Sequence, residues 1–239
     1  MQIVIDIETI PDQSEGALER MAADFTAKAP DLLKPQLIEA LGLGDDGKFK
    51  TVPELKAMWV EKFGEAAKLE QAKEKWLKTS FDGAYGQICC ICFDAENKNY
   101  SIVNEDEKQL LIDFWHSIER VSNGRPPYFI AHNAKFDLPF LYHRSVINNV
   151  EPCREFKPHG KHGYDHYCTM TAWAGFGGKI GLERLAGILG LGGKTEGMSG
   201  AEVWPEYQKG NIAKIIDYCR DDVALTKKVY ERLTFSGGD

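Results

Sequence analysis

Two carboxylates, Asp6 and Glu8, stand at the end of the first strand-like segment of the sequence. Alternate side chains of a strand face the same side, so both carboxylates are expected on one face, with Ile5 and Ile7 on the other. Two anions this close repel each other, and a divalent cation between them relieves the repulsion. Hard oxygen ligands select Mg²⁺ or Mn²⁺. The pair therefore indicates a metal site, although a structural or solvated pair explains the D-x-E spacing more simply when it is taken alone.

A third carboxylate, Asp137, ends the segment 131–137 (AHNAKFD), where the pattern changes from strand to helix. With Asn133 as the N-cap, Asn133 and Asp137 lie one helical turn apart on the same face. Asp137 is then able to join the first two carboxylates. An asparagine cap followed by a surface aspartate explains the segment more simply on its own.

The last candidate pair is Tyr218 and Asp222, in a helical pattern near the end of the chain. Their spacing of four residues places them on one helix face, while Asp221 points elsewhere. An ordinary phenol has a pKa of about 10, so it exchanges hydrogen bonds with a water molecule without acting as a strong base. A phenol beside a carboxylate therefore suits the positioning of an attacking water.

In chain order, these three segments closely resemble the Exo I, Exo II and Exo III motifs of the DEDD exonuclease superfamily, whose members share a ribonuclease H-like fold. Tyr218, together with Asp217 where the other branch carries histidine, resembles the DEDDy branch. Further segments resemble predicted exonucleases related to the proofreading domain of family B DNA polymerases. They are residues 181–185 (GLERL), 189–191 (LGL), 197–198 (GM), 203–204 (VW), Tyr207 and 217–220 (DYCR). The resemblance covers residues 1–10 and about 84–233, and no polymerase domain is expected in the chain.

The resemblance implies a 3'-5' exonuclease that hydrolyses phosphodiester bonds with two divalent cations, Mg²⁺ or Mn²⁺. Asp6 is expected to contact both cations, Glu8 and Asp222 to complete the first site, and Asp137 to hold the second. Tyr218, with Glu8, is expected to orient the attacking water. The implied substrate is DNA, most simply a single-stranded 3' end.

Residues near these motifs are candidates for contacts with the terminal nucleotide: Thr9, Ile10, Asn133 and Phe136. Ile10 is expected to act as an apolar wedge, and Phe136 either as a substrate contact or as a core anchor of its helix. His132 is better explained as a structural histidine than as a substrate contact. Lys179 and Lys194, in glycine-rich loops, are candidate phosphate contacts, although surface solubility explains them equally well.

The elements that must position these residues form an α/β pattern, with strands expected at 2–7, 86–93, 99–103 and 127–131. Helices are expected at 105–120 and 135–149, and the chain reads as wholly helical from about 165, ending in a helix over 211–233. We expect a ribonuclease H-like mixed sheet flanked by helices, with residues 1–239 forming a single exonuclease domain.

A stretch between the first two strands, residues 11–82, differs in composition and is rich in Ala, Lys and Glu. Trp59, Phe63, Ala72 and Trp76 recur at helical spacing with charged residues between them. The stretch is expected to be an inserted helical hairpin. Two roles are expected as alternatives: an amphipathic cover that packs on the core with its charged face in solvent, or an arm that grips DNA.

The charge balance, 29 Lys and Arg against 36 Asp and Glu, gives a net charge of -7. This counts mildly against a nucleic-acid substrate, but cations bound by carboxylates reverse the local field that a phosphate meets. The alternative enzymatic function is that of a 3'-5' exoribonuclease, because a carboxylate cluster does not distinguish DNA from RNA. An alternative without catalysis is a nucleic-acid-binding module that has the same fold.

The six cysteines do not suggest a disulfide framework, and three of them lie in one apolar strand-like run, ICCICF. A zinc site is the alternative for one later segment, although its spacings match no paired-ligand pattern. Its ligands would be Cys153, His159, His162, His166 and Cys168. No apolar run approaches the ~20 residues that span a membrane, and the N-terminus lacks the features of a secretory signal, so a cytoplasmic protein is expected.

Overall fold

The chain forms two compact units in a computed structural model that describes residues 1–193 and 198–237. The larger unit combines Met1–Pro11 with Ser80–Asp239, and the smaller unit is the inserted stretch Asp12–Thr79. No helix of the described residues is long and apolar enough to cross a membrane.

The larger unit is organised around a five-stranded mixed sheet in the order β3-β2-β1-β4-β5. Its strands are β1 (Gln2–Ile10), β2 (Gln87–Ala95), β3 (Lys98–Ile102), β4 (Tyr128–Ala131) and β5 (His166–Cys168). The central strand β1 pairs antiparallel with β2 and parallel with β4. This is a mixed α/β architecture consistent with the ribonuclease H-like exonuclease fold.

Two expectations about the strands need correction. The first strand continues past residue 7 to Ile10, so Asp6 and Glu8 lie inside it and not at its end. The chain after residue 165 is not wholly helical, because β5 forms there and pairs with β4. A strand of three residues is too short to show a two-residue alternation, and its partner strand in the folded sheet stabilises it.

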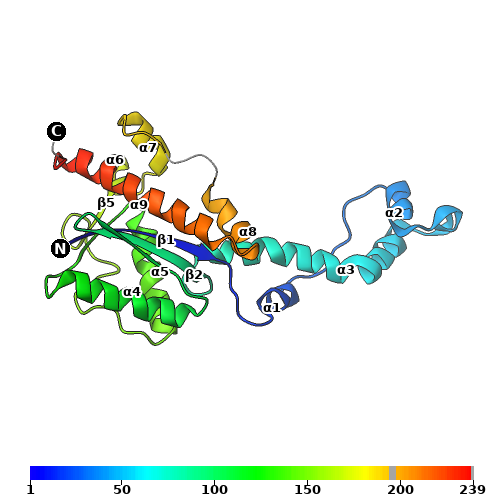
Figure 1. Cartoon of the computed structure of the whole chain (residues 1–239). Helices are drawn as coiled ribbons and strands as arrows, with labels where there is room; N and C mark the ends of the chain where they lie inside the picture. The colour runs from blue at the N-terminus through cyan, green and yellow to red at the C-terminus, as the bar shows by residue number, and fades with distance from the viewer. Residues whose placement is uncertain (194–197, 238–239) are drawn as a thin grey trace. The chain divides into compact units, whose positions relative to one another are not determined.

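The helices of the larger unit cover both faces of the sheet (Figure 1). They are α4 (Glu107–Ser122), α5 (Ala134–Ile147), α6 (Thr169–Ala174), α7 (Leu182–Ile188), α8 (Val203–Gln208) and α9 (Ile212–Thr234), with the 3-10 helix η3 (Gly200–Glu202). The three helices expected at 105–120, 135–149 and 211–233 are confirmed to within two residues at each end. Helices α4 and α5 cover one face, and α9 crosses the other.

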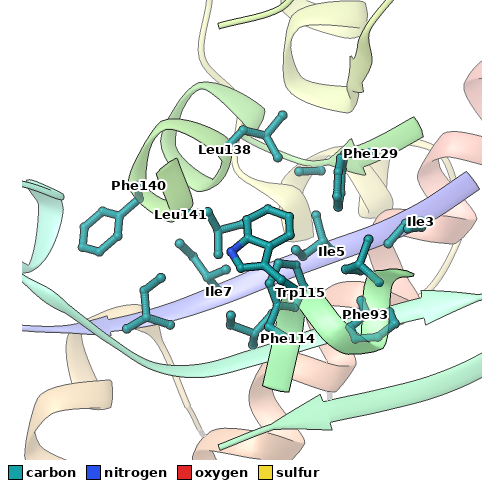
Figure 2. Close-up of a cluster of buried hydrophobic side chains, with 14 of the residues drawn as sticks. Ile3, Ile5, Ile7, Phe93, Phe114, Trp115, Phe129, Leu138, Phe140 and Leu141 are labelled. Atoms are coloured by element: carbon teal, nitrogen blue, oxygen red, sulfur yellow. The ribbon is translucent and has the colours of Figure 1, made fainter. Parts of the chain in front are cut away.

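Alternation along β1 divides the core between these faces. Ile3, Ile5 and Ile7 point toward α4 and α5 and surround Trp115 together with other apolar side chains (Figure 2). Val4 and Ile10 belong to the second cluster, on the α9 side. The side chains of Asp6 and Glu8 fall between Val4 and Ile10 in this alternation, so they face α9.

The inserted unit is helical, and its longest element is the single helix α3. Its elements are α1 (Ala17–Ala23), α2 (Lys34–Leu41), the 3-10 helix η1 (Gly44–Phe49) and α3 (Val52–Leu77), followed by the 3-10 helix η2 (Lys78–Phe81). Both α1 and α2 pack against α3, and Leu37, Leu41 and Leu55 form a small core. The apolar spacing of residues 59–76 arises from a single helix, because a capping box of Thr51 and Glu54 starts it and no break interrupts it.

A buried ion pair connects α4 to α5. The Arg144 guanidinium donates to both carboxylate oxygens of Glu107, at 3.0 and 2.6 Å. Glu107 also accepts from the Ile88 backbone amide of β2 at 2.7 Å and from the Asn148 side chain at 2.9 Å. Both charged side chains are only 7% exposed, so neither has water as an alternative partner. The pair therefore fixes α5, which carries Asp137, against the sheet.

We expect Arg144→Met to lower the free energy of unfolding by about 3–5 kcal/mol, because it leaves the Glu107 charge buried without its partner. Urea denaturation followed by circular dichroism measures the change. Arg125→Met is the matched control, since Arg125 forms a 2.7 Å ion pair with Glu96 at the surface. The control should lose only about 0–1 kcal/mol. Equal losses in the two variants would contradict a special role for the buried pair.

Candidate active site

The first two carboxylates lie on the central strand, on the face that α9 covers. Asp6 is opposite Cys92 of β2 and Glu8 is opposite Cys90, and a β-bulge follows between Glu8 and Thr9. Glu8 is buried and Asp6 is half-buried. The two-residue spacing thus places both carboxylates on one side of β1, where the pairing with β2 limits their movement.

Cys219 of α9 joins these two carboxylates. Carboxylate oxygens of Asp6 and Glu8 and the Cys219 sulfur all lie within 4.8 Å of one another. The Cys219 thiol also donates to the Asp6 backbone carbonyl at 3.4 Å. The sequence analysis did not assign Cys219 to the candidate site. Its position three residues before Asp222, in the same helix, is the signal that could have indicated this. Cys219 holds α9 close to β1 at the carboxylates.

Asp137 reaches the same site from the first turn of α5. Strands β1 and β4 pair only over Gln2–Val4 and Tyr128–Ile130, and farther along β1 the Ile7 backbone amide donates to the Asp137 carboxylate. Burial raises the pKa of Asp137 to about 7, and the charge of Asp222 adds to this, whereas hydrogen bonds from the Ile7 amide and its own amide oppose it. No sequence pattern indicates the contact with Ile7.

Tyr218 and Asp222 come from α9, one turn apart. Asp222 is buried and Tyr218 is half-buried beside the cluster that α9 forms with the sheet. The start of α9 is held by Glu206 of α8, which accepts from the Asn211 side chain at 2.6 Å and forms an ion pair with Lys214 at 3.3 Å. The Asn211 hydrogen bond is the largest of the interactions that lower the pKa of Glu206 to about 2. These contacts fix the position of α9 along the sheet.

The four carboxylates interact with one another electrostatically. Burial raises the pKa of Asp6 well above its ordinary value, and the charges of Glu8, Asp137 and Asp222 raise it further, while the Cys219 thiol opposes the rise. The charges that raise the pKa of Asp6 thus come from three separate elements, β1, α5 and α9. Among the described residues, the group within 4.8 Å that contains Asp6 consists of Asp6, Glu8 and Cys219. The carboxylates fit hard divalent cations, which prefer carboxylate oxygens and remove the mutual repulsion.

The residues proposed to contact a nucleotide occupy different environments. Asn133 is exposed at the expected N-cap position of α5, but its side chain makes no capping hydrogen bond. The Thr9 hydroxyl donates to the Ser80 carbonyl at 2.7 Å. Phe136 is half-buried, packs against the core and lies 5.4 Å from the Phe140 ring centroid. Phe136 thus has a packing role of its own.

The structure corrects the expectation for Ile10. Its side chain is only 2% exposed and packs in the cluster on the α9 side. The same alternation that directs Asp6 and Glu8 toward α9 also directs Ile10 into the core there. Ile10 therefore does not present an apolar wedge to a nucleotide in this structure.

His132 has a structural role. Its Nε2 lies 2.8 Å from the Ile180 carbonyl, which only accepts, so Nε2 carries the hydrogen. Its Nδ1 lies 2.8 Å from the Thr169 hydroxyl. His132 therefore ties the loop between α6 and α7 to the segment that follows β4. Lys179 of this loop is exposed, and Lys194 lies outside the described residues.

The cysteines are all free and buried. Within residues 1–193 and 198–237, two groups have the spacing to hold a metal: Asp6 with Glu8 and Cys219, and Cys90 with Cys92 and Cys219. The alternative zinc ligands between Cys153 and Cys168 do not form such a group in that part of the chain.

Comparison with known protein families gives one match, over residues 84–239, to the family described as "Predicted 3'-5' exonuclease related to the exonuclease domain of PolB". The matched range includes Asp137, Tyr218 and Asp222, while Asp6 and Glu8 lie before it. A search of curated proteins found no match. Strand β1, which lies before the matched range, pairs with β2 and contacts α9, both of which lie inside that range.

We expect Asp6→Asn to raise the thermal unfolding midpoint measured in EDTA, because it removes one charge from a group of mutually repelling carboxylates. A gain of about 1 kcal/mol corresponds to about 2–4 °C for a chain of this size. Adding Mn²⁺ should stabilise the wild-type protein more than the variant, because binding to the folded state raises its stability.

Asp217→Asn is the control for this experiment, since Asp217 is an exposed carboxylate on the same helix. It should behave as the wild type both with and without Mn²⁺. A lower midpoint for Asp6→Asn in EDTA, or an equal response to Mn²⁺ in all three proteins, would show that the carboxylates do not act as one cation-binding group.

Proposed function

Since the chain belongs to the family of predicted 3'-5' exonucleases related to the exonuclease domain of PolB, we propose that it removes nucleotides one at a time from the 3' end of DNA. The observation that carries the proposal is the convergence of Asp6, Glu8, Asp137 and Asp222 from three elements on one site. A non-catalytic binding module has no need for buried carboxylates that raise one another's pKa.

Two divalent cations, Mg²⁺ or Mn²⁺, are the proposed cofactors. Asp6, Glu8, Asp137 and Asp222 would hold them, and when bound they would supply charge stabilisation to the phosphate and acidify the attacking water. The carboxylate oxygens of the donor set support hard cations. The Cys219 thiol lies near Asp6 and Glu8 but donates to the Asp6 backbone carbonyl, and it is not among the proposed ligands.

The protein's own groups have separate tasks in this proposal. Tyr218, one turn before Asp222 on α9, would hold the attacking water in line with the phosphorus. The Ile7 amide keeps the Asp137 carboxylate turned toward β1, and Cys219 keeps α9 at the distance that allows Asp222 to reach Asp6. Asn133 and Thr9 would contact the terminal nucleotide at either side of the carboxylates.

We also propose that the chain acts as a single exonuclease domain into which residues 11–82 are inserted. The two ends of the inserted unit lie together, which supports this arrangement. The Trp76 indole donates to the Asp12 carbonyl at 2.7 Å, and the Asp12 amide donates to the Thr79 hydroxyl at 2.8 Å. Because the two ends of the inserted unit meet, the chain can leave the domain after β1 and return before β2 without separating these two strands.

We expect Asp6→Ala and Asp222→Ala each to lower the rate of nucleotide release by about 1,000-fold or more, because cation-based charge stabilisation is worth several kcal/mol. The assay follows Mg²⁺- or Mn²⁺-dependent release of mononucleotides from a 3'-labelled single strand. Asp217→Ala, an exposed carboxylate on the same helix, should retain full activity.

The same assay with matched single-stranded DNA, duplex DNA and RNA tests the substrate. Unchanged cleavage in both carboxylate variants would refute the proposed site. Oligonucleotide products would refute stepwise removal from the 3' end. Equal or faster degradation of RNA would reassign the protein as an exoribonuclease, since contacts to the 2'-hydroxyl decide that choice.

Tyr218→Phe tests the positioning of water separately from the binding of cations. Loss of one hydrogen bond to a charged centre is worth about 1.5–3 kcal/mol, so kcat should fall by about 10- to 100-fold. The Mn²⁺ concentration that gives half-maximal stabilisation in thermal unfolding should stay at the wild-type value. A fall in kcat accompanied by weaker Mn²⁺ binding would instead assign Tyr218 to the support of the cation ligands.

A further inference from the structure

Phe176 is 90% exposed on the surface of the larger unit, and its ring lies against the Lys135 ammonium. It lies in the loop between α6 and α7, in the sequence Ala174-Gly175-Phe176-Gly177-Gly178. A side chain exposed to this extent buries almost no apolar area, so it contributes little to folding. Its position suggests a ligand that covers it.

The loop around Phe176 adopts a backbone conformation that requires glycine. Gly175 and Gly177 have φ values of 78° and 83°, in the left-handed region that favours glycine. A Cβ atom at Gly178 would lie 2.2 Å from the Ala174 carbonyl oxygen, so only glycine fits there without movement of the backbone. The three glycines therefore define the conformation that presents the aromatic ring.

This loop lies at the same edge of the sheet as the candidate active site. Strands β1, β4 and β5 run parallel, so their carboxyl ends meet at one edge. Asp137 follows the end of β4, and the loop follows the end of β5 after the short helix α6. The 2.8 Å contact between His132 and the Ile180 carbonyl ties the loop to the segment just before Asp137.

The charge around Phe176 suits a polyanion. The Lys135 ammonium lies 3.8 Å from the centroid of the Phe176 ring, and Lys135 is in the first turn of α5, two residues before Asp137. Lys179, in the same loop, is also exposed. Residues 169–182 contain no acidic residue, although the chain as a whole carries a net charge of -7. The loop therefore offers a phosphodiester strand an aromatic ring beside positive charge, near the first turn of the helix that carries Asp137.

We propose that Phe176 is a stacking platform for a nucleobase of the single-stranded 3' end, with Lys135 on the opposite side of the ring to offset the charge of a nearby phosphate. The proposal rests on the proposed exonuclease function and adds a strand-binding site beside it. Stacking of a base on an aromatic side chain is tolerant of sequence, since every base has a π-face. Phe176 thus binds the strand without selecting its sequence.

Steady-state kinetics on single-stranded DNA with Mg²⁺ test the platform. We expect Phe176→Ala to raise KM by about 5- to 100-fold, the loss that removal of one base–aromatic stack produces. We expect kcat to stay unchanged, because the stack stabilises the bound strand and the transition state equally. Phe176→Tyr should restore the wild-type KM, whereas Phe176→Leu, which is apolar but not flat, should not.

A strand whose last nucleotides are abasic separates stacking from other effects. On this strand Phe176→Ala and the wild-type protein should have the same KM, since there is no base to stack. Phe235→Ala is the matched surface control, because Phe235 is 92% exposed and its neighbour Ser236 lies beside Met1 and Gln2, at the opposite end of β1 from Glu8. This control should match the wild type on both strands.

An unchanged KM for Phe176→Ala on normal DNA would overturn the platform. An equal increase on normal and abasic strands, or the same increase in Phe235→Ala, would also overturn it. Failure of the platform is distinguishable from failure of the proposed function. In the first case the wild-type protein degrades DNA with Mg²⁺ or Mn²⁺, and in the second case it degrades none of the strands.

Discussion

The mutual repulsion of Asp6 and the three carboxylates that act on it is the interaction on which the rest of the structure depends. Burial and the charges of Glu8, Asp137 and Asp222 all raise the pKa of Asp6, so the carboxylates by themselves oppose folding. The surrounding elements must therefore hold the acidic groups together against this force. Divalent cations bound between the carboxylates would remove this repulsion. A loss of stability in return for a binding site is common in active sites.

The central strand supplies that restraint. β1 is paired on both edges, and its alternation sends Ile3, Ile5 and Ile7 into one core while Asp6 and Glu8 face α9. Cys219 attaches α9 to the Asp6 carbonyl, and the Ile7 amide binds Asp137. One short strand thus provides core packing, two carboxylates and the anchoring points for the elements that carry the other two.

The remainder of the larger unit surrounds this centre with groups suited to a strand of nucleic acid. His132 holds the loop of Phe176 near the start of α5, and Lys135 places a positive charge against the exposed ring. These local positive charges would favour the proposed binding of a polyanion by a chain of net charge -7. The inserted unit has its own small core of Leu37, Leu41 and Leu55, so its fold does not depend on the carboxylate cluster.

The sequence alone determined the features that depend on local periodicity: the alternation of Asp6 and Glu8 in a strand, and the one-turn spacing of Tyr218 and Asp222 in α9. Backbone geometry sets both, so they are readable without knowledge of the fold. Tertiary structure alone decided the pairing that creates β5, the Cys219 and Ile7 contacts, and the burial of Ile10. These features depend on which segments of the chain contact one another across the sheet. The spacing of residues along the sequence does not specify those contacts.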